Sequence, residues 1–473
     1  MSTATEPSAR ARAAAAATIS HRLAEYATGL RFADLPAATI EKTKQAVLDH
    51  VGIGVRSSID RESSAVVRQV VDGLGSEGRG TAFGIGPRYQ PHYAALLNAT
   101  FAHTLDFDDT HEGGSIHPGA TTIPVVLALG EEARATGQQA IAAIVAGYDA
   151  TVRISEAADP AAHYDRGFHP TATCGTFGAT AAGASVSGLG TGVLENALGI
   201  NGSQASGSLQ FLENGAWNKR LHTGLAAHNA VLALRFARAG AVGARAPLEG
   251  RNGFFRGFTD DADPERVVRT LGEAFAIDET GFKPYPSCRY SHAAIELLCE
   301  IVAQERLSPD AVEGIRIGLP RKGIDLIGIP ETSKRAPEGI VDGQFSMYFL
   351  AAVALLRQRM TWDDYELLGD PLVARTMAKI RVEIDPEIEA RFPTMAASVE
   401  VVAGGRAFRR INWTPKGEPG KPMDWRELEQ KFRALARAVY DDAHCTRIVE
   451  MVRSLELVGE IGELTSLLGH PTA

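Results

Sequence analysis

The stretch from Phe101 to Gly119 (FAHTLDFDDTHEGGSIHPG) concentrates side chains that can exchange protons. Its three histidines and four acids are His103, His111, His117, Asp106, Asp108, Asp109 and Glu112. Apolar segments typical of helices precede and follow it, and buried polar groups are costly unless each finds a partner. We therefore expect a loop held at a helix junction, where catalytic residues are often found.

Three further polar stretches accompany predicted helix starts. They are Gly167–Thr171 (GFHPT), Asn218–Gly224 (NKRLHTG) and Lys283–His292 (KPYPSCRYSH). Exposed N–H groups at a helix start favour an anion. The same stretches supply the cations Lys219, Arg220, Lys283 and Arg289. The sequence therefore predicts a positive pocket, and a small polycarboxylate is its expected ligand.

The histidines of these stretches suit proton transfer. An unperturbed imidazole titrates near neutrality, so His117, His169 and His292 are candidate acids and bases. A single histidine is nevertheless more often a hydrogen-bonded core or surface residue, and we keep that interpretation for His103 and His228 on predicted helices. What favours a catalytic site is the combination of acids, bases and cations in loops.

The acids and the paired cations also have structural interpretations. Asp108 and Asp109 could cap a helix or pair with Lys or Arg. Lys219 and its neighbour Arg220 could form a solvated pair. These alternatives stay open at the level of sequence.

Composition excludes several classes of protein. The chain has 473 residues and a net charge of −9, and it shows no basic stripe, so we expect no nucleic-acid partner. No apolar run approaches the roughly 18 residues that span a bilayer, so we expect no membrane partner. The four cysteines are scattered without a CxxC pair, which indicates a reducing compartment such as the cytoplasm.

Metal binding is not favoured by the spacing of the candidate ligands. Asp106, His111 and His117 could contribute to a metal site, but the chain lacks HExxH-type helical spacing. We expect no metal and no cofactor.

The predicted fold class is mainly α. A large all-helical domain (18–278 and 417–473) carries a smaller α+β lid domain (279–416), inserted before the C-terminal helices. Apolar spacing predicts helices at about 62–74, 90–104, 119–135, 138–156, 171–188, 192–204, 223–239, 290–305 and 343–357. Period-2 alternation around Ile315, Val382 and Val399 predicts strands, and Gly404–Gly405 a hairpin turn. Residues 1–17 are expected to form a disordered tail.

The chain resembles a known family, MmgE/PrpD, over essentially its whole length. The resemblance rests on LDFDDTHEGGSIHPG, GFHPTATCGTFGA, ALGINGSQASG, NKRLHTGLAAHNA and FKPYPSCRYSHAA, in that order. The family includes 2-methylcitrate dehydratase, cis-aconitate decarboxylase and iminodisuccinate epimerase. The motifs do not choose among these reactions.

The resemblance implies a homodimer with no metal or organic cofactor, and a site in the cleft between the helical domain and the lid. By motif, the catalytic residues would be Asp106, His117, His169, Lys219 and His292. Thr110 would contact the substrate, and with Lys219, Arg220, Lys283 and Arg289 it completes the predicted substrate-binding set.

One segment departs from the family pattern. Family members usually carry Gln-x-Ser-x-x-Tyr on the lid, whereas here Gln344 and Ser346 are followed by Tyr348 and Phe349. The tyrosine is thus one residue early and phenylalanine takes its place. The difference bears on substrate placement or on the acid step.

These observations predict a cofactor-independent lyase that moves a proton at carbon next to a carboxylate of a citrate- or aconitate-like acid, with dehydration or decarboxylation. One alternative is an epimerase (isomerase) of a dicarboxylate such as iminodisuccinate. A second is a carboxylate-binding protein without catalytic activity. The joint presence of His117, His169, Lys219 and His292 speaks against the second alternative.

Overall fold

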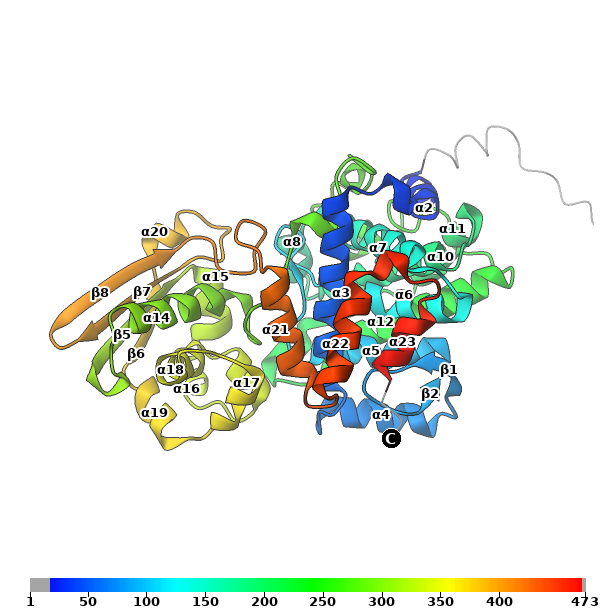
Figure 1. Cartoon of the computed structure of the whole chain (residues 1–473). Coiled ribbons are helices and arrows are strands. Elements are labelled where there is room, and N and C mark those ends of the chain that lie inside the picture. The colour runs from blue at the N-terminus through cyan, green and yellow to red at the C-terminus, as the bar shows by residue number, and fades with distance from the viewer. Residues whose placement is uncertain (1–17, 470–473) are drawn as a thin grey trace, which may run out of the picture. The chain divides into compact units, whose positions relative to one another are not determined.

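A computed structural model of the chain describes residues 18–469, which form two compact units (Figure 1). Within the described residues, unit 1 comprises 18–104, 108–280 and 425–469, and unit 2 comprises 105–107 and 281–424. The expected tail, 1–17, lies outside the described residues. The short segment 105–107 belongs to unit 2 although both of its neighbours belong to unit 1.

Unit 1 is helical, which confirms the predicted fold class. Its longer helices are α2 (Ile19–Gly29), α3 (Ala37–Ser57), α4 (Ser63–Gly73), α5 (Pro91–Thr104), α6 (Gly119–Ala133), α7 (Gly137–Ala157), α10 (Gly175–Val186), α11 (Thr191–Asn201), α12 (Asn218–Arg238), α21 (Trp425–Ala436), α22 (Asp442–Arg453) and α23 (Gly462–Leu468). The C-terminal helices return to the first: α21 and α22 both pack against α3. Among residues 18–469, no helix has the length and hydropathy that a membrane crossing requires.

Small residues bring the central helices of unit 1 into close contact. A Cβ added at Gly147 of α7 would lie 2.4 Å from Cγ2 of Thr122 on α6, and one at Gly178 of α10 would lie 1.7 Å from Oγ1 of Thr151 on α7. Only glycine fits at such distances, so these helices pack backbone against backbone. They form a rigid frame for the polar segments that join them.

Unit 2 contains a four-stranded sheet with the order β6-β5-β7-β8. The strands are β5 (Val312–Leu319), β6 (Ile380–Ile384), β7 (Ala397–Ala403) and β8 (Arg406–Asn412); β5 is parallel to β6 and antiparallel to β7. Gly404 and Gly405, with φ of 56° and 70°, connect β7 to β8 and pair Ala403 with Arg406. This confirms the predicted hairpin, because a two-residue turn of this kind needs positive φ.

Helices cover this sheet and complete unit 2. α14 (His292–Gln304) packs on β7 and β8, and α18 (Met347–Arg357) contacts α14 and β6. The predicted helix at 343–357 is interrupted, because α17 (Ile340–Gln344) ends before Ser346, whose side chain caps α18. A further helix of this unit is α19 (Pro371–Met377), and Ile315, Ile317, Val399 and Val401 are buried as their alternation predicts.

Two helix starts in unit 1 differ from the prediction. α9 (Pro170–Thr173) is separate from α10, and α12 begins at Asn218 rather than near residue 223. The NKRLHTG stretch is therefore the first two turns of a helix, and its description as a loop was wrong. This changes which way its side chains face, as described below.

Candidate active site

The polar stretch after α5 lies at a helix junction, as predicted. α5 ends at Thr104, and α6 begins at Gly119. Asp106 has a φ of 51°, a left-handed conformation that aspartate tolerates better than most residues, and it ends the helical path of α5. Beyond it, the two-residue strand β3 (Thr110–His111) bends back through a bridge between His111 and Ile116.

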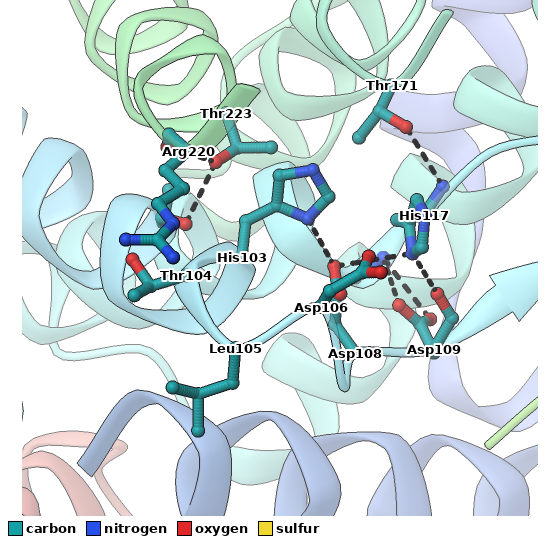
Figure 2. A network of polar contacts seen from close by, with 12 residues as sticks. His103, Thr104, Leu105, Asp106, Asp108, Asp109, His117, Thr171, Arg220 and Thr223 are labelled. Carbon is teal, nitrogen blue, oxygen red and sulfur yellow. Dashed lines mark hydrogen bonds and ion pairs between the residues drawn. The ribbon is translucent and has the colours of Figure 1, made fainter. Parts of the chain in front are cut away.

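Two imidazoles share one carboxylate oxygen at this junction (Figure 2). Nδ1 of His103 lies 2.7 Å from Oδ2 of Asp108, and Nδ1 of His117 lies 3.4 Å from the same oxygen. The His117 ring also approaches the backbone carbonyl of Asp109, at 2.8 Å, and its backbone N–H donates to Oγ1 of Thr171. His103 and Asp108 are buried, while the His117 side chain is 14% exposed.

Two further histidines extend this group of rings. His169 precedes α9 and stacks on His103, with ring centroids 5.7 Å apart and planes 24° apart. Its Nδ1 lies 3.2 Å from Nδ1 of His222 on α12. We call His103, His117, His169 and His222, together with Asp108 and Lys219, the histidine cluster.

Burial and positive charge keep two of these rings neutral. Burial lowers the pKa of His169 well below its ordinary value, and His103 and Lys219 lower it further. The pKa of His222 falls to about 4 for the same reasons. Lys219 stands in the first turn of α12 and is partly exposed, so it can offer its charge to a ligand beside these rings.

Asp109 lies next to the cluster but has a different environment. Its carboxyl accepts the Tyr148 hydroxyl at 2.7 Å and the backbone N–H of Gly119 at 3.2 Å. A Cβ at Gly119 would lie 2.4 Å from the Tyr148 hydroxyl, so glycine is needed for this contact. Burial, followed by the charge of Asp108, raises the pKa of Asp109 to about 8. At neutral pH Asp109 therefore holds a proton.

Unit 2 places its predicted cations in ion pairs. Nζ of the buried Lys283 donates to the carbonyl of Asp106 at 2.8 Å and lies 3.2 Å from its Oδ1. Arg289 pairs with Glu418, and its guanidinium also donates to the Lys416 carbonyl. Asp106, Lys283 and Arg289 thus have internal partners in unit 2, and their predicted catalytic and substrate-binding roles stay predictions.

His292 is buried at the start of α14, and both of its ring nitrogens are engaged. Arg289 donates to Nδ1 at 2.9 Å, so Nε2 carries the hydrogen and donates to the carbonyl of Ser287 at 3.2 Å. Burial and then Arg289 lower the pKa of His292 well below its ordinary value. In this geometry the ring holds Arg289 in place. Proton transfer by His292 stays a prediction and requires one of these bonds to open.

Arg220 and Lys219 face different directions although they are neighbours. Arg220 is buried; its guanidinium donates to Oγ of Ser63 at 2.9 Å and lies 3.5 Å from Glu62. Figure 2 shows it pointing away from the rings of His103 and His117. The predicted substrate contact of Arg220 would have to form from this position. Thr110, also a predicted contact, is partly exposed at the start of β3.

Three members of the cluster were absent from the predicted site: His103, Asp108 and His222. His103 was assigned a structural role because it ends a predicted helix, and Asp108 was expected to cap a helix or pair with a cation. Asp108 instead pairs with histidines. His222 carried a usable signal, since it follows Lys219 by three residues and such residues share a helix face.

The cluster also includes a geometry that the sequence spacing did not reveal. His103, Asp108 and His117 offer ligand atoms that all lie within 4.8 Å of one another, a spacing that could hold a metal ion. The sequence argument against a metal considered Asp106, His111 and His117, which is a different set. The expected absence of a metal therefore stays a prediction and needs a direct test.

The segment that departs from the family pattern is buried in unit 2. Phe349 stacks on Tyr365, with centroids 5.7 Å and planes 18° apart, and the Tyr365 hydroxyl donates to the carbonyl of Pro286 at 2.7 Å. Tyr348 packs beneath the guanidinium of Arg335. Where the resemblance predicts a tyrosine, unit 2 has an apolar ring in a stacked pair.

Comparison with known proteins agrees with the motifs. The MmgE/PrpD N-terminal domain matches residues 21–267, and the MmgE/PrpD C-terminal domain matches residues 285–457. This protein belongs to the MmgE/PrpD family.

Several similar proteins align with nearly the whole chain. The cis-aconitate decarboxylase-like protein oryM of Aspergillus oryzae is 26% identical over 95% of this chain and 97% of its own length. Human cis-aconitate decarboxylase is 25% identical over 96% and 95%, and that of Aspergillus terreus is 25% identical over 96% of both chains.

Proposed function

We propose that this protein is a lyase that acts on a small polycarboxylate related to cis-aconitate, by decarboxylation or dehydration and without a metal or organic cofactor. The observation that carries the proposal is the histidine cluster, in which a carboxylate holds two imidazoles within a chain of the MmgE/PrpD family. The relatives named as cis-aconitate decarboxylases favour decarboxylation over dehydration.

Decarboxylation of such an acid requires one proton transfer to carbon. The bond between carbon and the departing carboxylate breaks, CO₂ leaves, and its electron pair stays on the substrate, delocalised toward a neighbouring carboxylate. An acid then donates a proton to that carbon and the electron pair forms the new C–H bond. We assign this proton to Nε2 of His117, which first takes up a proton to form the imidazolium and then releases it to carbon while Nδ1 keeps its own hydrogen. Nδ1 faces the Asp109 carbonyl, and the ring is partly exposed.

The transition state gathers negative charge on the substrate, and the cluster offers positive charge to meet it. The positive charge of Lys219 acts on His169 and His222, whose pKa values it lowers. A neutral His169 can donate one hydrogen bond to a carboxylate, or take up a proton when an anion arrives. In this proposal Lys219 and His169 bind and polarise the substrate while His117 protonates it.

We also propose that the chain acts as a homodimer in the cytoplasm. On α4 and its cap, Val66, Val70 and Leu74 form a stripe at helical spacing and are 46–58% exposed. Such a stripe suits contact with a second copy. Light scattering is expected to give about twice the chain mass of 50.3 kDa at micromolar concentration, and a single-chain mass would contradict the dimer.

Product analysis tests the reaction. Purified protein is incubated in D₂O with cis-aconitate, citrate and a four-carbon amino or imino dicarboxylate, and products are identified by NMR. We expect turnover of a tricarboxylate with CO₂ release or loss of water. Exchange of the Cα proton without either loss would identify an epimerase, and no reaction with any acid while one binds would indicate a binding protein.

A further inference from the structure

We propose that Asp108 is a positioning residue of this active site: it fixes the tautomer of His103 so that Nε2 of that ring becomes a second proton-accepting atom beside His117. The inference rests on the proposed function and names residues that neither the family motifs nor the relatives assign. It starts from the hydrogen positions that the geometry requires.

The Nδ1 atoms of both rings face acceptors. Asp108 Oδ2 stands 2.7 Å from Nδ1 of His103, and an ionised carboxylate can only accept a hydrogen bond, so this nitrogen carries the hydrogen. For His117 the same conclusion follows from the Asp109 carbonyl at 2.8 Å, which is also an acceptor only. In both rings Nδ1 therefore keeps its hydrogen, and Nε2 is the nitrogen at which a proton can be gained or released.

Asp108 is the carboxylate that bears the negative charge here. Two adjacent buried acids repel one another, so one of them keeps its proton. The hydrogen-bond partners distinguish the two acids. Oδ2 of Asp108 faces nitrogens of two imidazoles, which stabilise an anion, whereas the Asp109 carboxyl meets the neutral Tyr148 hydroxyl and the backbone N–H of Gly119. Asp108 is thus available as an anion to both imidazoles.

Among the described residues, the second ring nitrogen of His103, Nε2, lacks the hydrogen bond that a buried polar atom needs. Its Nε2 is buried, and among residues 18–469 it has no hydrogen-bond partner. An orphaned buried acceptor is costly and calls for a ligand. The His103 ring contacts both proposed catalytic rings, with centroids 5.0 Å from His117 and 5.7 Å from His169. A proton-bearing group of a substrate, or a water molecule that it carries, meets this requirement.

The two rings differ in how they depend on Asp108. His117 has the Asp109 carbonyl as a second acceptor, so its tautomer survives without Asp108. Nδ1 of His103 is held by Asp108. In Asp108→Asn the amide can donate as well as accept, which lets His103 move its hydrogen to Nε2. His117 then serves as an internal control within the same protein.

Nitrogen NMR of full-length protein labelled with ¹⁵N-histidine tests this directly and does not require activity. In the wild type we expect the Nδ1–H tautomer for both His103 and His117. In Asp108→Asn we expect the Nε2–H tautomer to appear at His103 while His117 is unchanged. An unchanged His103, or an Nε2–H tautomer already present in the wild type, would overturn the proposal.

Steady-state kinetics of the proposed lyase reaction, measured as kcat and KM, supply the second readout. Asp108→Asn is expected to lower kcat by about 10²–10⁴-fold with a smaller change in KM. His103→Phe keeps the ring packing and removes both nitrogens, and it should lower kcat by at least about 10-fold. Asp149→Asn is the matched control: Asp149 is a buried acid of α7 that accepts from Tyr26 and Ala276. This control should lower the melting temperature and leave kcat within about threefold.

The two readouts separate failure of this inference from failure of the proposed function. If the predicted tautomers are found but no tricarboxylate reacts, the lyase assignment fails and the arrangement of Asp108 stands. If the enzyme turns over and folded Asp108→Asn and His103→Phe both keep wild-type kcat, the inference fails and the lyase assignment stands. If Asp108→Asn loses stability as Asp149→Asn does and its kcat falls no further than in that control, Asp108 has a structural role and the inference is overturned.

Discussion

The histidine cluster of unit 1 and the cations of unit 2 differ in how fully their ionisable groups are bonded to internal partners. In unit 2, Lys283 pairs with Asp106, Arg289 pairs with Glu418, and both nitrogens of His292 are bonded. In the histidine cluster a single carboxylate serves two rings, and Nε2 of His103 has no partner among the described residues.

The difference indicates which region is built to exchange protons. A ring transfers a proton more easily when one of its nitrogens is not held by an internal hydrogen bond. Nε2 of His103 has no hydrogen-bond partner among the described residues, whereas both nitrogens of His292 are engaged. Unit 2 holds Lys283 and Arg289 in internal ion pairs, and we propose that unit 1 carries the group that moves a proton.

Replacement of His169 is expected to lower activity more than the other changes described below. His169→Gln removes a ring that contacts His103 and His222 and lies in the field of Lys219. We expect kcat/KM for the tricarboxylate to fall by about 10²-fold or more, the usual scale for a lost acid–base group. His228→Gln, which changes a partly buried histidine of α12, is the control and should stay within about twofold. Equal activities in both folded variants would remove His169 from the site.

A second prediction concerns Asp109 and the pH dependence of stability. The folded protein keeps a proton on Asp109 up to about pH 8, whereas the unfolded chain releases it near pH 3.8. Between these values the folded state binds one proton more, so the contribution of Asp109 to the free energy of unfolding falls as pH rises, by about 1.4 kcal/mol per unit.

Asp109→Asn mimics the protonated form and removes this slope. From pH 5 to 7 the wild type should lose stability relative to the variant, by about 1.4 kcal/mol of unfolding free energy per pH unit. Denaturant titrations at several pH values in one buffer system measure it. A difference that is constant with pH would mean that Asp109 is ionised in the folded protein.

A third prediction tests the assignment of His292 to the region that holds charge. His292→Ala removes the acceptor for Arg289 and should lower the free energy of unfolding by about 1–3 kcal/mol, with kcat reduced less than about tenfold. His292→Gln, which keeps an acceptor and a donor, should recover part of the stability. A fall of about 10²-fold in kcat in a well-folded variant would instead support the catalytic role predicted from the sequence.

The smallest expected effect is that of a chelator. If the histidine cluster moves protons, its Nδ1 atoms carry hydrogens and are not metal ligands, so extensive EDTA treatment should leave kcat unchanged. Elemental analysis of the purified protein accompanies the assay. Stoichiometric zinc or iron, with activity lost on its removal and regained on its return, would make His103, Asp108 and His117 a metal site.

The sequence predicted the scaffold well because its signals are local. Apolar spacing identified most helices, and alternation with Gly404–Gly405 identified the sheet and its hairpin. Boundaries failed where one residue decides the path of the chain. Ser346 caps α18 and separates it from α17, and α12 starts at Asn218 before its apolar spacing becomes visible.

The candidate site was predictable only in part. It depends on the direction in which helix side chains point and on the turn by which the chain reverses after α5. Successive residues of a helix point about 100° apart. Lys219 and Arg220, interpreted as one cationic pair in a loop, therefore act at different places: the charge of Lys219 lowers the pKa of His169, and Arg220 donates to Ser63. Likewise, the chain reverses after Thr104 and brings Asp108 onto His103, five residues earlier, which no helical or strand spacing encodes.

We propose that the histidine cluster delivers the proton to carbon, with His117 as the donor. Turnover of cis-aconitate in D₂O by wild-type protein and by His117→Gln, followed by NMR at saturating substrate, tests this most directly. The account predicts one deuterium per molecule on the protonated carbon for the wild type. For the variant we expect a kcat lower by at least about 10²-fold, at a similar KM and melting temperature. Wild-type kcat and deuterium incorporation in folded His117→Gln would contradict it.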